Sequence, residues 1–407
     1  MSVSAATQEI KVYGYRWVVL LTFMFISLTM QIFWICYAPI TGMAAEQYGV
    51  SDLEIALLAM LFMYIYIPLA IPASWAIDTW GFKKAVGLGA ILMGVFGMVR
   101  GIWTDSYTAA LIGTIGIAIA QPLFLNSGTK LAANWFPLGE RATVIGLGAI
   151  APFLGIVIGQ MATPSLVAAS SLSTTMLIYG ILGAISAIVF LLFARDHPPT
   201  PAGYEVRVLM WEGFKHVLKM RDFWLLAFIL FVVNAIFNGL STYVEMMVRP
   251  RGMGVGEAGT IGGLLMIGGI VGVFILPPIS DRMHKRKPIF LVGLVAMIPF
   301  LLLFSFINNF ALLALDTFLL GLFMMGLLPV ALQYGTEICY PAPEGTSGGL
   351  MTLAGQLSVI AITGMGLSNQ ASGSFAPSMI ILVVATAVSA VLLYIMKESK
   401  MMTEPQK

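Results

Sequence analysis

Three polar side chains within apolar segments have the chemistry to hold a small organic cation. Trp34 offers an indole face that attracts a cation by about 0.5–2 kcal/mol, and Gln121 and Gln356 offer amide groups. An amide inside a long apolar run costs free energy unless it meets a partner, so each glutamine is expected to face protein or a watery cavity. Hydrogen bonding between helices and contact with a ligand explain each glutamine equally well. Their combination with Trp34 favours the ligand.

Glu245 is an acidic side chain inside an apolar segment. Arg249 follows four residues later, a spacing that permits an ion pair on one helix. Asn234 and Asn238 lie on the same helical face and extend it into a polar stripe. Two interpretations of Glu245 therefore stay open: a structural ion pair with Arg249, or a carboxylate that couples protons or attracts an amine.

These side chains must be positioned by membrane helices. Of 407 residues, 59% are hydrophobic and 10% are charged, against about 25% charged in soluble chains. This composition excludes an ordinary soluble enzyme. Apolar stretches of about 20 residues, long enough to cross a bilayer, lie at 16–43, 52–77, 84–103, 107–133, 141–165, 172–194, 222–248, 257–280, 288–307, 310–338, 345–368 and 376–396. We expect an all-α membrane protein with twelve transmembrane helices.

The positions of the charges predict the orientation in the membrane. The 21 Lys and Arg residues nearly cancel the 19 Asp and Glu residues, so no basic surface for nucleic acid is implied. The termini and the loops between even and odd stretches hold 18 of the 21 cations, which leaves Arg100, Arg249 and Arg251 for the other face. The positive-inside rule then places both termini in the cytoplasm. We expect a multi-pass protein of the cell membrane, either plasma or inner. Arg100 and Asp316, near the outer ends of their stretches, are expected at the interface.

An internal repeat divides the chain. Asp78 and Asp281 are 203 residues apart, and Glu140 precedes Glu344 by 204. This offset predicts two pseudo-symmetric six-helix bundles, 1–194 and 222–407, joined by a cytoplasmic linker, 195–221. In transporters with such repeats the substrate lies near the midplane between the halves. The same offset makes Trp34 and Asn238 repeat mates.

The loops after the second and eighth stretches combine an acid, a turn and bases. Such an acid can pair with a cation or cap a helix in one conformation and release it in another. A role in setting topology alone would explain the bases but not the acids. We therefore expect a gating function for Asp78, Gly81, Lys83, Lys84, Glu140, Arg141, Asp281, Arg282, Arg286 and Glu344.

These loops resemble the D-R-x-G-R-[RK] signature of the major facilitator superfamily. A narrower resemblance rests on Phe33-Trp34-Ile35-Cys36-Tyr37, Ala120-Gln121-Pro122 and Tyr340-Pro341-Ala-Pro343-Glu344-Gly345-Thr346-Ser347. These stretches are similar to the feline leukaemia virus subgroup C receptor-related proteins, solute carrier family 49. The resemblance implies the superfamily fold and transport of choline or ethanolamine, with haem and vitamin-like compounds also proposed as substrates.

In that family, aromatic and amide side chains enclose the amine head group. The resemblance transfers this role to Trp34, Gln121 and Gln356, while Asn238 stands where the family has an aromatic residue. The departure affects the expected substrate rather than the expected fold.

The sequence thus predicts an alternating-access carrier of a cationic amine such as choline or ethanolamine, working by facilitated diffusion. The alternative is a proton-coupled carrier of another organic solute, such as an organic anion, a vitamin-like compound or haem. A receptor or sensor is disfavoured because the loops are short. No nucleophile, phosphate-loop or metal-ligand pattern occurs, so we expect that the protein is not an enzyme and binds no cofactor or metal. We expect a monomer whose partners are its substrate and the lipid bilayer. The expected substrate contacts are Trp34, Tyr37, Gln121, Asn234, Asn238, Glu245 and Gln356.

Overall fold

A computed structural model describes residues 12–199, 210–340, 342 and 344–399, and within them the chain is helical without strands. The first group of helices is α1 (Arg16–Ile35), α2 (Thr41–Tyr48), α3 (Asp52–Trp80), α4 (Phe82–Ile102), α5 (Tyr107–Leu125), α6 (Gly128–Trp135), α7 (Leu138–Ala169) and α8 (Leu172–Phe193). The second group is α10 (Arg221–Val248), α11 (Val255–Met283), α12 (Lys287–Phe306), α13 (Phe310–Ile338), α14 (Glu344–Gln356), α15 (Val359–Ser372) and α16 (Ala376–Ile395), with α9 (Met210–Lys219) before it.

Twelve helical spans in this part of the chain are long and apolar enough to cross a membrane. The prediction of an all-α membrane protein with twelve transmembrane helices is confirmed. Several helices begin at a polar cap that satisfies their first N–H groups. At α3, Ser51 and Glu54 form a reciprocal capping box, and Ser106, Ser171 and Asn309 cap α5, α8 and α13.

Three of the apolar stretches that we expected to be continuous are interrupted. The first is split by a short 3₁₀ turn, Ala38–Ile40, which contains Pro39, and then continues as α2. The fourth is split between α5 and α6 at Asn126, whose amide binds Tyr66 and Ser74 of α3. The eleventh is split between α14 and α15, where the Ser358 N–H bonds to Gly355 O.

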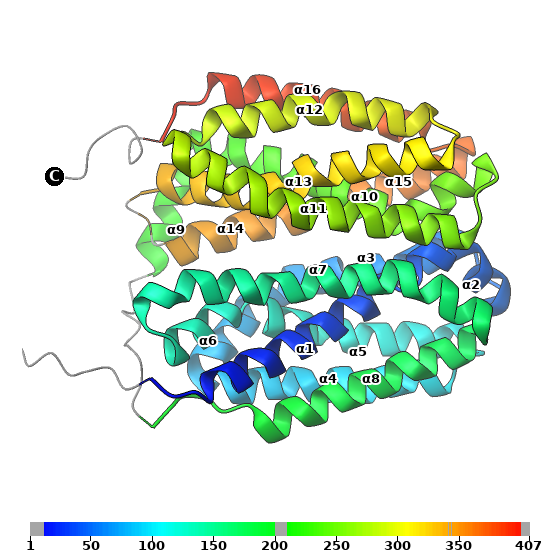
Figure 1. Cartoon of the computed structure of the whole chain (residues 1–407), viewed down its shortest axis with the longest axis horizontal. Helices are drawn as coiled ribbons and strands as arrows, with labels where there is room; N and C mark the ends of the chain where they lie inside the picture. Colours follow the sequence, from blue (N-terminus) through cyan, green and yellow to red (C-terminus); the bar gives the residue numbers. More distant parts are fainter. Residues whose placement is uncertain (1–11, 200–209, 341, 343, 400–407) are drawn as a thin grey trace, which may run out of the picture.

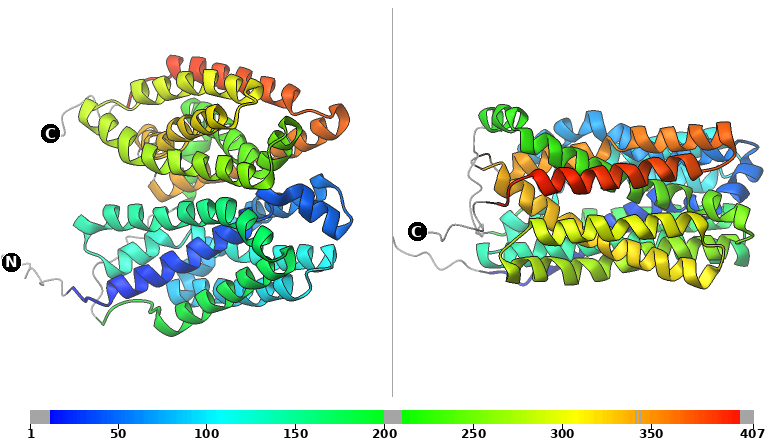
Figure 2. Two further views of the ribbon diagram at one scale, coloured as in Figure 1. Left: turned by 45° about the vertical axis from the view of Figure 1, so that its right-hand side comes forward. Right: turned by 90° about the horizontal axis from the view of Figure 1, so that it is seen from above.

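The helices form two groups that lie side by side. In Figure 1, α1 to α8 occupy the lower half and α10 to α16 the upper half, and Figure 2 shows the same separation from a second direction. Across the seam, α7 packs against α11, and α3 packs against α14 and α15. The beginning of α1 and the end of α16 lie at one end of the bundle, which we name the terminal end. The other end is the opposite end.

Candidate functional site

Trp34 lies at the junction of the two helix groups. Its indole N–H donates to Ala59 O of α3 at 3.1 Å, and its ring centroid is 6.2 Å from that of Phe237 on α10. The side chain is buried. Phe237 was not predicted. It precedes Asn238 as Phe33 precedes Trp34, so the repeat offset could have identified it.

The structure places two of the predicted residues, Asn234 and Asn238, against Gly355 and Ser358, which flank a third, Gln356. We name Asn234, Asn238 and Gln356 the amide cluster. Asn234 Nδ2 donates to Leu230 O at 2.8 Å, and Asn238 Nδ2 donates to Ser358 Oγ at 3.4 Å. A Cβ placed on Gly355 would meet Asn234 at 2.9 Å. The two asparagines of α10 therefore pack against the interruption of the eleventh span, where Gln356 is the last residue of α14.

Two further glutamines come from the first helix group. Gln121 of α5 is buried, and its Oε1 has no hydrogen-bond partner among the described residues. Gln31 of α1 was not predicted; it lies three residues before Trp34 on the same helical face, is 7% exposed, and bonds to no described residue. It carries the same sequence signal as Gln121, an amide inside an apolar run.

These amides lie at similar depths. Gln31, Gln121, Asn234 and Gln356 stand 12 to 15 residues after the first residue of their helices, which is about 18–23 Å at 1.5 Å per residue. Because α5 with α6 and α14 with α15 each make up one span, this is near the middle of each span, whether it is counted from the terminal end (Gln31, Asn234, Gln356) or from the opposite end (Gln121). The site therefore consists of amides and one aromatic pair at mid-height, beside the seam of the two groups.

Tyr37 and Arg100 form a separate cluster within the first group. The Arg100 guanidinium lies 4.4 Å from the Tyr37 ring centroid and donates to Phe33 O at 3.0 Å, while the Tyr37 hydroxyl lies 2.8 Å from that of Tyr48. Arg100 is 1% exposed, so it faces protein, while its expected depth at the interface stays a prediction. Backbone and aromatic partners inside the group hold the cation in place of water and lipid head groups.

Asp316 is also buried, at 4% exposure, and both carboxyl oxygens lack a partner among the described residues. It faces protein as well, and its expected depth at the interface stays a prediction. The stretch that contains it begins six residues earlier, with Asn309 as the helix cap. Asp316 is therefore already inside the second helix group, because one and a half turns carry it past the helix end.

Glu245 belongs to a cluster that joins the two groups toward the opposite end. It forms the ion pair with Arg249 that the spacing permits, at 3.6 Å, and its Oε2 accepts from the Gly42 N–H at 3.3 Å. Arg249 also pairs with Asp52, the first residue of α3. We name Asp52, Glu245 and Arg249 the cross-group ion cluster.

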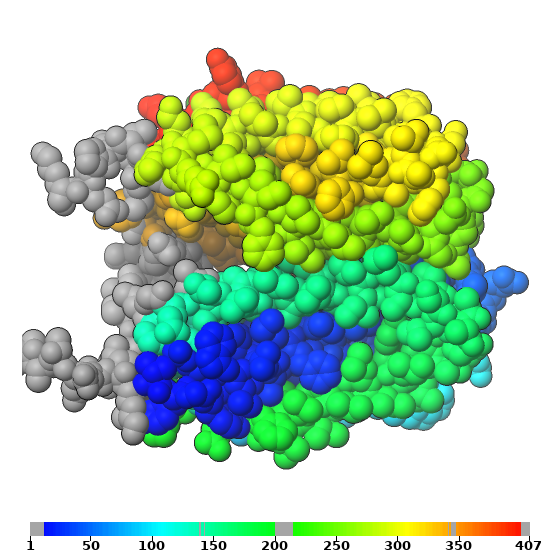
Figure 3. Space-filling view, in the orientation of Figure 1, coloured from blue at the N-terminus to red at the C-terminus, as the bar shows by residue number. Residues whose placement is uncertain are grey.

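Further bonds join the groups between mid-height and the opposite end. Tyr64 and Thr363 hydroxyls are 2.6 Å apart, and Gln160 Nε2 donates to Ser241 O at 3.0 Å. Near the terminal end, the Asp78–Lys130 and Arg286–Glu337 ion pairs each stay within one group. There an apolar crevice separates α7 from α11, lined by Gly146, Ala149, Ile150, Phe153, Ile270, Val273 and Phe274; Figure 3 shows this seam across the molecular surface. The bundle is closed at the opposite end.

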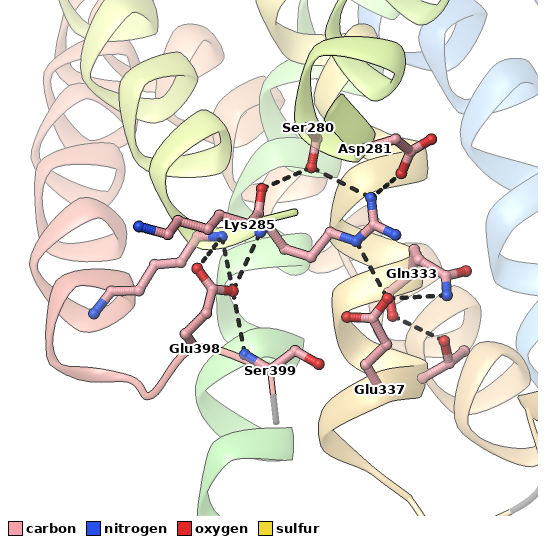
Figure 4. Close-up of polar contacts among 10 residues, drawn as sticks. Ser280, Asp281, Lys285, Gln333, Glu337, Glu398 and Ser399 are labelled. Atoms are coloured by element: carbon pink, nitrogen blue, oxygen red, sulfur yellow. Dashed lines mark hydrogen bonds and ion pairs between the residues drawn. The ribbon is translucent and has the colours of Figure 1, made fainter. Parts of the chain in front are cut away.

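Polar networks at the terminal end stay within each group. In the second group, Arg286 binds Asp281 and the Oε1 of Glu337, the latter at 3.2 Å, as Figure 4 shows. Glu398, which follows α16, accepts from the N–H of Arg286 at 3.2 Å and of Lys287 at 3.3 Å, and so caps α12. Arg282 is exposed, and the side chain of Glu344 lies outside the described residues.

The first group repeats this arrangement. Asp78 pairs with Lys130 at 3.5 Å, and Asp196, which follows α8, accepts from the Lys83 N–H at 3.1 Å and so caps α4. Gly81 has φ +87°, and a Cβ there would collide with the Asp196 carboxylate. Asp196 and Glu398 are 202 residues apart, so the repeat offset could have revealed this pair, which sequence reasoning missed.

The remaining predicted gating residues also have local partners. Glu140 pairs with Arg16 at 2.9 Å. Arg141 donates to Phe136 O at 3.1 Å and to Ala133 O at 3.0 Å, which satisfies carbonyl groups at the end of α6. Lys84 is exposed.

Twelve membrane helices in two groups, closed at one end around a polar centre, define a membrane carrier of the two-bundle class. The family model described as Major Facilitator Superfamily matches residues 19–363. The chain belongs to the major facilitator superfamily and is a transporter, not an enzyme.

Named relatives agree with the narrower resemblance. Solute carrier family 49 member A3 of Xenopus tropicalis is 29% identical over 370 residues, covering 86% of this chain and 77% of the relative. The choline/ethanolamine transporter flvcr2b of Danio rerio is 28% identical over 380 residues, covering 88% and 78%. A crystal structure of a bacterial homologue of the human lysosomal transporter Spinster has a TM-score of 0.74 at 17% identity, covers 94% of this chain and 97% of that one, and shows the common fold.

Proposed function

We propose that the protein carries a small cationic amine, of the choline or ethanolamine type, by alternating access. The observation that carries this proposal is the occurrence at mid-height of the Trp34–Phe237 pair and of several amides, among them Gln121 with its buried, unbonded Oε1. The indole face attracts a cation, and amide oxygens accept hydrogen bonds from its polar groups. The similarity to the choline/ethanolamine transporter flvcr2b of Danio rerio supports the same substrate class.

The carrier works by facilitated diffusion, with residues 1–194 and 222–407 moving as two units and a monomer as the working form. The excess of cations in the loops of the terminal end supports a cytoplasmic position for that end and residence in the cell membrane. The cross-group ion cluster then forms the outer gate. Asp78 and Asp281 belong to the inner gate, and in this state each binds a cation of its own helix group.

Uptake of labelled choline and ethanolamine into proteoliposomes tests the proposal. Trp34→Ala removes the cation–π contact and is expected to reduce uptake about 2- to 30-fold, from 0.5–2 kcal/mol at 1.4 kcal/mol per tenfold. Trp103→Ala is the matched control, because that ring is 57% exposed at the end of α4. Absence of flux for both amines in the wild type contradicts the substrate assignment but leaves the fold intact.

A second candidate, a proton-coupled carrier, is favoured by one observation. Glu245 is 3% exposed and holds both Arg249 and the Gly42 N–H, so protonation would weaken a link between the groups. Uptake measured with and without an inward proton gradient separates the candidates. Stimulation by the gradient that Glu245→Gln abolishes supports coupling, whereas gradient-independent uptake supports facilitated diffusion.

A further inference from the structure

We propose that the site selects a primary ammonium, R–NH₃⁺, over a quaternary ammonium, R–N(CH₃)₃⁺. This inference rests on the proposed amine transport and concerns the choice between its two head groups. A primary ammonium has three N–H donors and needs acceptors. A quaternary ammonium has no donor and is held by aromatic faces. The site can therefore be judged by counting unbonded acceptors against aromatic rings.

Two members of the amide cluster, Asn234 and Asn238, keep a side-chain oxygen without a hydrogen bond to a described residue. Leu230 O, as a carbonyl, can only accept, so its partner on Asn234 must be the NH₂ group, and Asn234 Oδ1 is left without a bond. Asn238 directs its NH₂ group to Ser358 Oγ and likewise leaves Oδ1 unbonded. Each asparagine thus uses one N–H donor on protein and keeps its acceptor.

Two glutamines supply further amide groups without hydrogen-bond partners among the described residues. Gln121 Oε1 is buried and has no partner within the described part of the chain, a state that costs free energy until a donor arrives. Gln31 lies three residues before Trp34 on α1, its Cβ faces Gly155 of α7, and it makes no hydrogen bond to a described residue. We assign Gln31 as an additional positioning residue for the head group.

Aromatic faces are fewer. The Trp34 and Phe237 rings pack against each other at 6.2 Å and 43°, so they form one wall and do not surround a cation. The repeat mate of Trp34 is Asn238, an amide in the place where the second half would supply another ring. Glu245 already holds Arg249 and Gly42, so the amides and the aromatic wall compensate the charge of the amine.

The unbonded acceptors and the single aromatic wall both favour a primary ammonium. A primary ammonium bonds to oxygens that are otherwise unsatisfied, whereas each added methyl group removes a donor and leaves an acceptor unpaired. Sites built on hydrogen bonds reject analogues that lack the donor by large factors, up to about 10⁴–10⁵. For a site that keeps one aromatic wall we expect a smaller preference, at least about tenfold.

The test is the series ethanolamine, N-methylethanolamine, N,N-dimethylethanolamine and choline, used as competitors of labelled ethanolamine uptake by the wild-type protein in proteoliposomes. The expected result is a stepwise loss of apparent affinity with each methyl group, at least about tenfold over the series. A flat series, or a preference for choline, overturns the inference while the proposed function survives. If no member is carried or competes, both fail.

Variants test the assigned residues. Asn238→Phe exchanges an acceptor for a ring and is expected to move the preference toward choline by at least about tenfold. Gln31→Leu is expected to weaken ethanolamine more than choline, which a merely structural role would not do. Gln370→Leu is the matched control, because that glutamine is exposed at the end of α15, and it is expected to leave the order unchanged. An unchanged order in both site variants overturns the assignment.

Discussion

At the scale of single residues, buried polar groups differ by whether they have partners. Arg100 is buried without a described carboxylate nearby, yet it binds Phe33 O and stacks on Tyr37. Glu337 is buried and binds Arg286. Asp316 is buried and binds nothing in the described residues. A charge that has partners is stabilised, whereas a lone carboxylate inside a helix group pays the full cost of desolvation unless it is neutral.

This contrast predicts opposite effects for two conservative substitutions. Asp316→Asn keeps the shape and removes a potential charge that no described group compensates, so the thermal midpoint in detergent should stay the same or rise. Glu337→Gln breaks a buried ion pair and should cost about 3–5 kcal/mol. Thermal unfolding of both variants beside the wild type decides the point. A drop for Asp316→Asn as large as that for Glu337→Gln would show that Asp316 has a partner outside the described residues.

The same scale shows what the sequence could predict of the site. Depth along a helix and chemical type were readable, and they identified Trp34, Gln121 and the amide cluster. The direction in which a side chain points was not, because it depends on helices that pack hundreds of residues away. The contacts of Tyr37 with Arg100 and Tyr48 illustrate this limit, while its role as a substrate contact stays a prediction.

At the scale of elements, the number of spans and their approximate limits were predictable from apolar length. The interruptions within the spans could not all be predicted from the sequence. Pro39 marks one of them in the sequence, but the break at Asn126 depends on bonds to α3. The break after Gln356 lies beside Asn238 of α10. Such breaks follow from tertiary contacts, and the one after Gln356 lies at the amide cluster.

Close packing of α11 on α13 gives a prediction at this scale. A Cβ on Gly321 would collide with the backbone carbonyl of Leu265, whereas a Cβ on Gly364 of α15 would meet nothing within 4 Å. Gly321→Ala should therefore destabilise the protein by about 1–3 kcal/mol through overpacking. Gly364→Ala should be neutral or stabilising, because alanine favours the helix. Thermal unfolding measures both, and equal effects would contradict the packing argument.

At the scale of the whole molecule, the bonds between the helix groups are distributed unevenly. They run from mid-height to the opposite end, where the cross-group ion cluster lies, and the described terminal end has a crevice between α7 and α11. In an alternating-access carrier, opening one end requires closing the other, because both states share one pair of rigid groups. The structure therefore represents the state closed at the opposite end.

Removal of Arg249 should shift this equilibrium. Arg249→Met deletes the bonds to Asp52 and Glu245, and a loss of about 1.4 kcal/mol changes the ratio of the two states tenfold. Spin labels at Asp105 and Asn308, in exposed loops at the opposite end, should then show a larger population of long label-to-label distances. Labels at Lys84 and Lys285, exposed at the terminal end, should show a larger population of short ones. Lys397→Met, another exposed cation, should leave both distributions unchanged. Lengthening at one end without shortening at the other would mean that the cluster holds the fold together and does not gate it.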